Sequence, residues 1–270
     1  MLTLAQTDAR DAYDTLASTY DTLTAGYPYR RWLAALEQLA LQHGLDGTRL
    51  LDVACGTGKS FVPMLERGYD VVACDVSEGM VERARRKAPD ATVVAGDMRR
   101  LGTLGEFDLL TCLDDSLNYL LEFEELVATL RGFRQNLAPC GVAVWDVNAL
   151  AMYRTSFASD WVTDAPDAFI AWQGEAGASF APGDVTAARI DIFEQTEDGW
   201  SRRSCVHQQR HWPVEVLREA ACEAGLRVLA VHGQHRGAVI DDAVDESLHT
   251  KVVFVACRDD RPRRGRGGVR

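Results

Sequence analysis

The sequence predicts an α/β fold built around a mostly parallel sheet. Four short apolar segments start near residues 50, 71, 92 and 107. Amphipathic segments with a helical period alternate with them, at 58–67, 77–87 and 122–137. This alternation is typical of parallel strands joined by crossover helices that cover both faces of a sheet. In addition, the first strand runs directly into a glycine-rich turn, where open α/β sheets hold nucleotides.

Further elements are predicted on either side of these four strands. Two helices, at 8–23 and 28–43, precede the first strand, because apolar residues recur there with helical spacing and Gly26 and Pro28 interrupt the pattern. After the fourth strand, the pattern predicts a strand at 142–147, a helix at 213–224 and closing strands near 227–232 and 251–257.

An insertion separates the fifth strand from the end of the sheet. Apolar and polar residues alternate over 187–195 and 200–212, on either side of Glu197-Asp198-Gly199, which predicts a β-hairpin. We expect the insertion to lie as a lid over the carboxyl ends of the strands. Its four tryptophans either contribute to the wall of the site or pack the hairpin onto the sheet; they are Trp161, Trp172, Trp200 and Trp212.

The predicted organisation therefore has five parts. They are an N-terminal helical cap (1–45), a ligand-binding core (46–149), an inserted antiparallel region (150–212), a completion of the core (213–258) and a mobile, Arg-rich tail (259–270).

Composition excludes several classes of function. The chain has 270 residues, 47% of them hydrophobic, which is enough to bury the core of one α/β domain. A formal net charge of −11 argues against a nucleic-acid surface, which needs clustered Lys and Arg. Seven cysteines without a C-x-x-C pair predict a reducing compartment and no metal site. Without a secretory segment or a membrane-length apolar run, the protein is expected to be soluble and cytoplasmic.

The glycine-rich turn has the sequence LLDVACGTG. Gly56 and Gly58 let the backbone approach a ligand and adopt torsions that other residues disfavour. Asp52 is expected to bind near the turn or to brace it. A phosphate-binding P-loop is disfavoured because Val53 stands where that loop requires glycine, and the third glycine of the dinucleotide pattern is absent.

Acidic residues end the next two strands. Asp75 lies 19 positions after Gly56, where a ribose diol would be held by a charged hydrogen-bond acceptor. Asp97 would accept from an exocyclic amine, while the neighbouring Met98 thioether would lie on a purine face. These residues predict a ligand that contains adenosine.

A polar cluster, DDSLNY at 114–119, follows the fourth strand. It leaves the sheet at the crevice where open α/β sheets bind ligands. Asp115 is the preferred hydrogen-bond acceptor or base for an incoming ammonium, and Asn118 would orient it. Helix capping by Asp114 or Asp115 is the competing explanation.

Together, LLDVACGTG, Asp75, GDM at 96–98 and CLDDSLNYL at 112–120 resemble the class I S-adenosylmethionine-dependent methyltransferases, over roughly residues 10–258. The resemblance is greatest to bacterial small-molecule enzymes that include aminosugar and lincosamide N-methyltransferases. It implies a Rossmann-like fold with a seven-stranded sheet whose last strand is antiparallel, with S-adenosylmethionine as cofactor and no metal. It also implies a small-molecule acceptor in secondary metabolism, such as antibiotic biosynthesis, and is compatible with a homo-oligomer. The implied donor-binding residues are Tyr20, Trp32, Asp52, Ala54, Gly56, Gly58, Asp75, Val76, Met80, Asp97, Met98 and Leu113.

Aromatic residues of the two N-terminal helices are candidates for the site. Tyr13 and Tyr20 lie two helical turns apart on one face, a spacing that is also common in packed cores. In the resembled branch, a tyrosine of a Tyr-Asp pair, here Tyr20-Asp21, reaches the cofactor end of the site. Tyr29 and Trp32 would touch the methionine part of the donor or pack their helix on the sheet.

Two histidines of the predicted hairpin, His207 and His211, share one face of their strand, and histidine titrates in the useful range of pH. Each is either an acid–base group or a half-exposed sheet residue. The residues predicted to take part in catalysis are Tyr13, Tyr20, Asp115, Asn118 and His211.

An amine nitrogen is the preferred methyl acceptor, and oxygen is the alternative because no residue pattern distinguishes them. A nicotinamide dehydrogenase would share Asp75 and the glycine turn, but the absent third glycine and the GDM triplet disfavour it. A DNA amine methyltransferase is disfavoured because residues 113–116 lack the paired prolines used around a flipped base. A non-catalytic module that binds S-adenosylmethionine is the alternative from another class.

Overall fold

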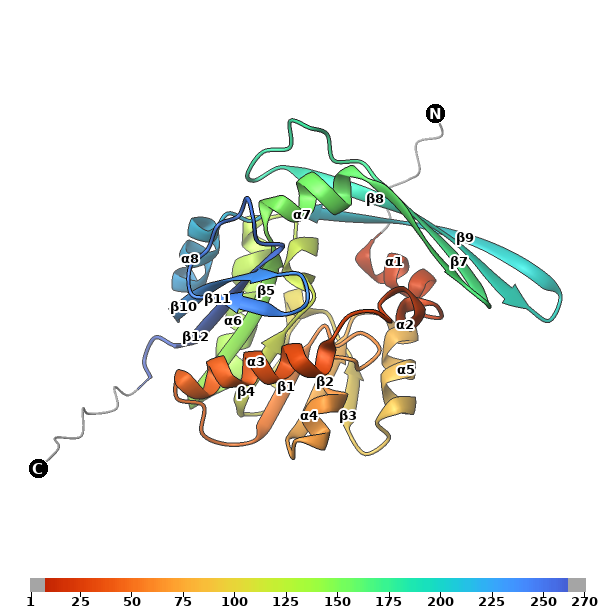
Figure 1. The fold of residues 1–270 in the computed structure, drawn as a ribbon. Coiled ribbons are helices and arrows are strands. Elements are labelled where there is room, and N and C mark those ends of the chain that lie inside the picture. The colour runs from red at the N-terminus through yellow and green to blue at the C-terminus, as the bar shows by residue number, and fades with distance from the viewer. Residues whose placement is uncertain (1–7, 262–270) are drawn as a thin grey trace, which may run out of the picture.

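The main sheet has eight strands, in the order β11-β10-β12-β5-β4-β1-β2-β3 (Figure 1). The structure is a computed structural model that describes residues 8–261. The strands are β1 (Arg49–Val53), β2 (Asp70–Asp75), β3 (Thr92–Ala95), β4 (Phe107–Cys112), β5 (Leu137–Asn148), β10 (Leu226–His235), β11 (Val239–Asp241) and β12 (Lys251–Arg258).

Strand direction in the main sheet agrees with the prediction. Strands β1 to β5 run parallel, whereas β12 is antiparallel to both β5 and β10. The seven expected strands and the antiparallel last strand are thereby confirmed. The eighth strand, β11, has three residues and pairs with the outer edge of β10. It is too short to produce an alternating pattern, so the sequence does not predict it.

Helices cover both faces of the main sheet. Because successive strand residues point to opposite faces, Leu50 belongs to one hydrophobic core and Leu51 to the other. The first core includes α3 (Tyr29–Gln42), α4 (Val62–Glu66) and α5 (Glu78–Lys87), and the second includes α6 (Phe123–Asn136) and α8 (Val214–Glu223). Among the helices of residues 8–261, none has the length and apolarity needed to cross a bilayer.

Two predicted helices differ from those observed. The helix predicted at 58–67 begins only at Val62, because Gly58 has a φ of +90° and cannot continue a right-handed helix. The helix predicted at 8–23 is interrupted at Thr19, whose amide and hydroxyl both donate to the carbonyl of Leu16 and close a turn. The resulting pair is α1 (Ala9–Leu16) and α2 (Tyr20–Leu23).

The insertion forms a second sheet, which we call the lid sheet. Its hairpin is confirmed, because β8 and β9 pair around a turn in which Gly199 has a φ of +116°. The apolar side of the hairpin contacts Ala12 and Leu16 of α1, so this helix connects the lid sheet to the main sheet (Figure 1). Two more strands, not predicted from sequence, extend it; the order is β6 (Asp160–Ala165), β7 (Ala168–Gly174), β8 (Val185–Thr196) and β9 (Gly199–Arg210). The helices α7 (Leu150–Thr155) and η3 (Ser156–Ala158) lead into it.

The four tryptophans of the insertion differ in their surroundings. Trp161 and Trp172 stack on neighbouring strands, with ring centroids 5.2 Å apart. Trp212 is buried, and its Nε1 donates to the carbonyl of Leu120 at 3.0 Å. Trp200 is 56% exposed. Packing therefore explains the other three positions, whereas Trp200 lies mostly in solvent. None of the four forms a wall of the pocket at the carboxyl ends of β1 to β4.

The C-terminal segment is anchored as far as the structure describes it. The Arg134 guanidinium donates to Asp259 at 3.2 Å, and Arg261 donates to the carbonyls of His43 and Gly44. The tail predicted to be mobile from residue 259 is thus ordered in its first three residues. The rest of that prediction, for 262–270, lies outside the described residues.

Candidate functional site

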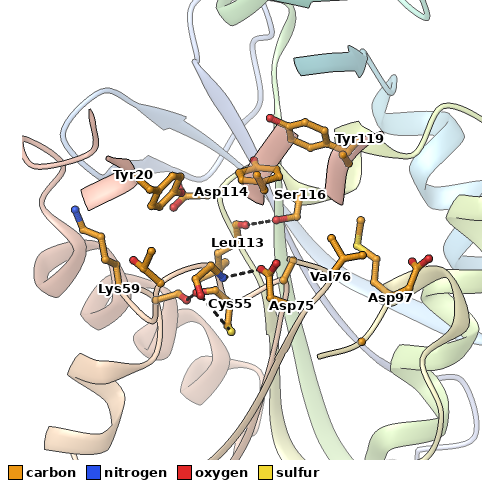
Figure 2. Close-up of a pocket in the computed structure, with 18 of the residues that line it drawn as sticks. Tyr20, Cys55, Lys59, Asp75, Val76, Asp97, Leu113, Asp114, Ser116 and Tyr119 are labelled. Carbon is orange, nitrogen blue, oxygen red and sulfur yellow. Dashed lines mark hydrogen bonds between the residues drawn. The ribbon is translucent and has the colours of Figure 1, made fainter. Parts of the chain in front are cut away.

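A pocket opens at the carboxyl ends of β1 to β4, between them and α1 (Figure 2). We call it the main pocket. It brings together residues as distant in the sequence as Asp8 and Leu120, because parallel strands end at the same edge of a sheet. Nine of the predicted site residues line it; they are Tyr13, Tyr20, Ala54, Gly56, Asp75, Val76, Asp97, Met98 and Leu113.

The glycine turn forms one wall of the main pocket. Ala54 and Gly56 both have left-handed backbone torsions, with φ of 57° and 53°. A Cβ added to Gly56 would have the Tyr20 ring, at 3.8 Å, as its only neighbour within 4 Å among the described residues. A larger side chain at this position would therefore grow into the space between the turn and Tyr20.

Asp52 supports this turn through buried hydrogen bonds. Its buried carboxylate accepts from the hydroxyls of Ser60 and Thr111, the latter at 2.6 Å. Burial raises the pKa of Asp52 to about 7, although the hydroxyls oppose the shift by stabilising the carboxylate. Of the two roles expected for Asp52, its position matches the brace, since it does not line the main pocket.

Asp75 ends β2 at the centre of the main pocket (Figure 2). Its carboxylate accepts from the amide of Gly56 at 2.8 Å and from the amide of Ser77 at 2.9 Å. Burial raises the pKa of Asp75 to about 6, against the stabilising effect of these amides. A buried carboxylate fixed in this way can accept further hydrogen bonds from a diol.

Asp97 lies at one end of the main pocket (Figure 2). Met98, which also lines the main pocket, follows it as the first residue of η1 (Met98–Arg100). The Asp97 carboxylate accepts from the amide and the guanidinium of Arg99. Although partial burial raises the pKa of Asp97, these hydrogen bonds lower it overall. The carboxylate therefore remains ionised beside the Met98 thioether.

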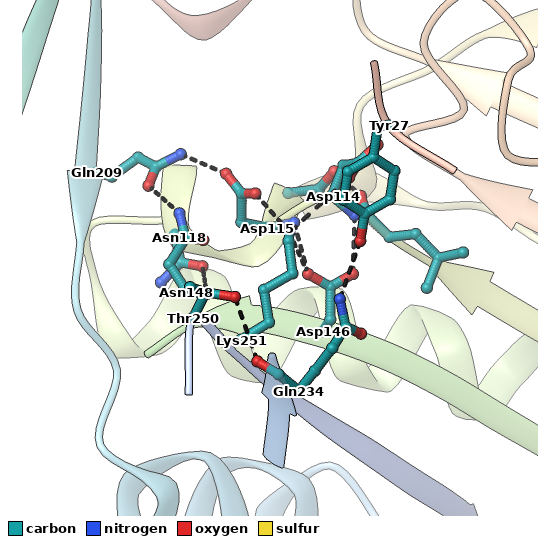
Figure 3. A network of polar contacts seen from close by, with 12 residues as sticks. Tyr27, Asp114, Asp115, Asn118, Asp146, Asn148, Gln209, Gln234, Thr250 and Lys251 are labelled. Carbon is teal, nitrogen blue, oxygen red and sulfur yellow. Dashed lines mark hydrogen bonds and ion pairs between the residues drawn. The ribbon is translucent and has the colours of Figure 1, made fainter. Parts of the chain in front are cut away.

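A buried ion cluster positions the loop after β4 (Figure 3). Asp114 and Asp115 have left-handed torsions, with φ of 56° and 53°, and both amides donate to the carboxylate of Asp146, at 2.8 and 3.0 Å. The Lys251 ammonium donates to Asp115 and to Asp146, each at 2.7 Å. Consecutive left-handed residues form an anion-binding concavity, which explains why a carboxylate occupies it.

Asp114 is the carboxylate of this cluster that lines the main pocket. It accepts a hydrogen bond from the Tyr29 hydroxyl, and its second oxygen lies 3.8 Å from the Lys251 ammonium. Burial raises the pKa of Asp114 to about 6, and Lys251 opposes this rise. The site thus offers an acidic group next to the phenols of Tyr20 and Tyr29.

Asp115 and Asn118, predicted to face an acceptor, lie outside the main pocket. Asp115 points to Lys251 and accepts from Gln209 at 2.7 Å. Asn118 is fully buried and joins β9 to β5, since it donates to the carbonyl of Arg210 and accepts from the amide of Asn148. Asp115 therefore does not occupy the predicted position, because the two consecutive left-handed residues turn Asp114 toward the main pocket instead.

His211 also lies away from the main pocket. Its Nε2 is 2.6 Å from Glu246, and its Nδ1 accepts from the amide of Gly183. Strand β9 ends at Arg210, so the alternation that placed His211 on the face of His207 no longer applies to it. His207 is the histidine that approaches the site, because its Nδ1 lies 2.9 Å from the hydroxyl of Tyr119.

Three further predicted donor-binding residues belong to the core. Trp32 is fully buried, and its Nε1 donates to Gln234 at 2.6 Å. Of its two expected roles, this position matches packing of α3 on the main sheet. Met80 is fully buried as well. Gly58 permits the turn itself, since an added Cβ would lie 3.1 Å from the ring of Phe61.

Several pocket residues were not predicted as binding or catalytic residues. The sequence predicts Asp114 only as a helix cap and gives no role to Lys59, which follows the glycine turn. Ser116 and Tyr119 belong to the predicted polar cluster and Tyr29 to the second predicted helix, but none of them is among the predicted binding or catalytic residues. Their sequence signal is proximity to the predicted motifs; no local pattern identifies Asp8, Ala9 or Arg99, which also line the main pocket.

Within residues 8–261, one group of side chains has the composition of a metal site, outside the main pocket. The ligand atoms of His235, Asp241 and His249 lie within 4.8 Å of one another. However, Nδ1 of His249 accepts from the amide of Asp245 at 2.9 Å, so the proton of this neutral ring is on Nε2, which faces Asp241. A metal ligand at Nε2 needs that nitrogen unprotonated, and the cluster is arranged instead as a hydrogen-bonded group.

Comparison with known proteins identifies the family. A methyltransferase domain family matches residues 50–141. YqeM of Bacillus subtilis (strain 168), a provisional methyltransferase by name, is 30% identical over 223 residues, which cover 80% of this chain and 87% of YqeM. The chain belongs to the class I S-adenosylmethionine-dependent methyltransferases. It therefore uses S-adenosylmethionine as its methyl donor.

Two other relatives extend this result. The crystal structure of an S-adenosylmethionine-dependent methyltransferase from Clostridium acetobutylicum ATCC 824 has the same fold, with a TM-score of 0.77 and 21% identity, covering 91% of this methyltransferase and 98% of that chain. The dTDP-3-amino-3,4,6-trideoxy-alpha-D-glucopyranose N,N-dimethyltransferase of Streptomyces venezuelae is 31% identical over 161 residues, covering 58% of this chain and 63% of that protein.

Proposed function

We propose that this methyltransferase transfers a methyl group to an amine nitrogen of a small molecule. The Asp114 carboxylate carries the proposal, because it is the member of the buried ion cluster that lines the main pocket. A carboxylate in this position holds an ammonium or an N–H group next to the donor. The relative from Streptomyces venezuelae, named for an amino-sugar substrate, supports this choice of acceptor atom.

The donor would occupy the main pocket along its length. Asp75 would accept from the ribose hydroxyls, and Asp97 with Met98 would hold adenine at one end. Lys59 lies at the opposite end, beside Tyr20 (Figure 2). Its ammonium donates to two oxygens of Thr24, at 2.8 Å each, and has a third N–H for the methionine carboxylate.

Methyl transfer from this donor is an in-line displacement. The nitrogen forms a bond to the methyl carbon while the carbon–sulfur bond breaks, and the electron pair of that bond neutralises the sulfonium. The two reacting atoms must first be held about 3 to 3.5 Å apart and in line, so positioning provides most of the rate. The proton that the nitrogen loses passes to the Asp114 carboxylate.

The basicity of Asp114 favours nitrogen over oxygen. Its pKa of about 6 lies far below that of an aliphatic hydroxyl, which is about as weak an acid as water. Such a carboxylate cannot activate a hydroxyl appreciably. An amine already carries a nucleophilic lone pair once its ammonium proton has left, and a weak base suffices for that step.

The proposal is tested by labelling. The protein is incubated with deuteromethyl S-adenosylmethionine and either a panel of paired amines and alcohols or an extract of the producing cells, and products are searched by mass. We expect the label on nitrogen and absent from each matched alcohol. Label found only on oxygen or carbon would contradict the proposed acceptor.

A further inference from the structure

Tyr29, the first residue of α3, contacts two charged side chains of the main pocket. Tyr29, Lys59 and Asp114 all line this pocket. The Tyr29 hydroxyl donates to the carboxylate of Asp114, which lies between β4 and η2 (Ser116–Tyr119). The Lys59 ammonium lies over the Tyr29 ring, 5.0 Å from its centroid. The same phenol therefore contacts the proposed ligand of the methyl acceptor and the proposed ligand of the donor carboxylate.

Neighbouring rings hold the Tyr29 side chain in one orientation. It is 7% exposed, and its ring packs edge-on against Tyr27, with centroids 5.0 Å apart, and against Trp32, at 6.1 Å. Both of these rings are anchored on β10, because Trp32 donates to Gln234 at 2.6 Å and Gln234 donates to the Tyr27 hydroxyl at 2.9 Å. A phenol enclosed in this way can fix the groups that it contacts.

The hydroxyl of Tyr29 fixes the orientation of Asp114. An ionised carboxylate only accepts hydrogen bonds, so the proton of this contact belongs to Tyr29. Oδ2 of Asp114 accepts it, whereas Oδ1 lies 3.8 Å from the Lys251 ammonium. Each oxygen thus has its own partner, and the remaining lone pairs can accept an N–H of the methyl acceptor. Without the hydroxyl, the carboxylate could rotate away from the position that the reaction needs.

The ring of Tyr29 fixes Lys59. The face of an aromatic ring attracts a cation, and Thr24 accepts two hydrogen bonds from the same ammonium, at 2.8 Å each. The third N–H of Lys59 is the one assigned to the methionine carboxylate. Figure 2 shows Lys59 and Asp114 on the side of the main pocket where Tyr20 lies, away from Asp97.

We propose that Tyr29 is a positioning residue that sets the relative position of the two reactants: its hydroxyl holds Asp114 toward the methyl acceptor, and its ring holds Lys59 toward the methionine carboxylate of the donor. Methyl transfer needs the reacting atoms in line, and one rigid side chain that fixes both ligands reduces the freedom lost before the reaction. The inference rests on the proposed roles of Asp114 and Lys59. Both contacts of Tyr29 can nevertheless be tested without an acceptor.

The ring contact is tested by calorimetry with S-adenosylhomocysteine and with methylthioadenosine, which is the same adenosine thioether without the carboxylate. Tyr29→Leu, which removes the ring, should raise the Kd of S-adenosylhomocysteine about fivefold to tenfold, the scale of a partly buried cation–π contact. Methylthioadenosine should bind normally, which also shows that the variant is folded. Tyr29→Phe keeps the ring and should bind both ligands normally.

Tyr29→Met is measured as well, so that this test does not depend on one variant. In a Lys59→Met background, loss of the ring should add no further weakening, because the ring acts through Lys59. An equal change in the Kd of both ligands, or no change for either, would overturn the role of the ring.

The hydroxyl contact is tested by ¹³C NMR of the full chain labelled at the aspartate carboxyls and saturated with S-adenosylhomocysteine, with Asp114→Asn used to assign the signal. Tyr29→Phe should raise the pH at which Asp114 titrates by about one unit, because its ionised form loses a hydrogen-bond donor. Tyr69→Phe is the matched control. Tyr69 is also 7% exposed and donates to a carboxylate, that of Glu37 at 2.9 Å, but it does not line the main pocket.

Other charged and titratable groups also act on Asp114. They are Tyr20 of α2, Tyr27, Lys59, Asp115, Asp146 of β5 and Lys251 of β12. Both phenylalanine variants keep all of these groups, so the difference between the variants isolates the Tyr29 hydroxyl. An unchanged titration of Asp114 in Tyr29→Phe, or an equal shift in Tyr69→Phe, would overturn the role of the hydroxyl.

The consequence for catalysis is tested with an amine that the labelling experiment identifies. Tyr29→Phe should lower kcat about tenfold, the effect of one lost hydrogen bond, and move the acid limb of the kcat/KM profile to higher pH. In an Asp114→Asn background the same substitution should add no loss, because the hydroxyl acts through Asp114. Tyr69→Phe should leave kcat and the pH profile unchanged.

An unchanged kcat and pH profile in Tyr29→Phe, or an equal loss in the Asp114→Asn background, would contradict a positioning role. Failure of the labelling experiment to find any methylated amine would count against the proposed function alone. NMR and calorimetry would still decide whether Tyr29 holds Asp114 and Lys59.

Discussion

Asp75 and Asp114 both line the main pocket, and burial raises the pKa of each to about 6, yet the protein holds them in different ways. Asp75 accepts hydrogen bonds from backbone amides of the adjoining turns, including the amide of Gly56. Asp114 depends on Tyr29 from α3 and Lys251 from β12, which are distant in the sequence. The donor side of the main pocket is thus formed by local structure, and the proposed acceptor side by tertiary packing.

Removal of Lys251 should have the largest effect on stability. Its ammonium lies 2.7 Å from both Asp115 and Asp146, so Lys251→Met leaves these buried carboxylates without their cation. We expect the free energy of unfolding, measured in urea, to fall by about 3 to 5 kcal/mol. Arg30→Met is the control, because Arg30 pairs with Glu66 at the surface and should leave stability unchanged. An equal change in the free energy of unfolding in the two variants would contradict the claim that the acceptor side is held by tertiary packing around Lys251.

Gly56→Val should abolish donor binding. Valine is strained at a φ of 53°, and its side chain would enter the space beside Tyr20. We expect the Kd of S-adenosylhomocysteine, measured by calorimetry, to rise at least about a hundredfold, from a clash with the ligand of about 3 kcal/mol. Gly68→Val has similar strain, with a φ of 92°, but meets nothing within 4 Å, and should bind normally. Normal binding by Gly56→Val would refute the location of the donor.

Asp75→Ala should weaken donor binding by about 1.5 to 3 kcal/mol, the contribution of charged hydrogen bonds. Asp70→Ala provides a matched control, since Asp70 is exposed at the opposite end of β2. Calorimetry with S-adenosylhomocysteine should show a change for Asp75 alone. Similar changes in both variants would indicate a general effect on the strand.

Donor affinity should also depend on pH. The ligand hydroxyls need the ionised form of Asp75, whose pKa in the free protein is about 6. Affinity is therefore complete above that value and decreases as the pH falls through it, because binding must then first remove a proton. Asp75→Asn should flatten the profile, whereas Asp114→Asn should leave it unchanged. A profile that persists in Asp75→Asn would assign the titration to another group.

The donor side of the main pocket, which is formed by local structure, is also the part that the sequence predicts. The glycine turn, Asp75, and Asp97 with Met98 all lie where the motifs indicate, because each follows directly from a strand end. The parallel direction of β1 to β5 is predicted for the same reason, since short apolar runs and their connections are local features. The antiparallel direction of β12 is implied only by the family resemblance.

The proposed acceptor side of the main pocket could not be predicted from the sequence, because it depends on contacts between distant segments. Two consecutive left-handed residues decide that Asp114, and not Asp115, enters the main pocket. The end of β9 at Arg210 separates the environments of His207 and His211. Neither event leaves a pattern in the sequence, and both depend on pairing with partners that lie far along the chain.

The most direct test of the account is the activity of Asp114→Asn compared with Asp115→Asn, using deuteromethyl donor and an amine that the wild type methylates. The account predicts that Asp114→Asn lowers kcat/KM about a hundredfold or more, the usual scale for loss of a proton acceptor, with unchanged affinity for S-adenosylhomocysteine. Asp115→Asn should affect stability more than kcat/KM. Full activity in Asp114→Asn would contradict the account, since the carboxylate in the main pocket would then have no part in the reaction.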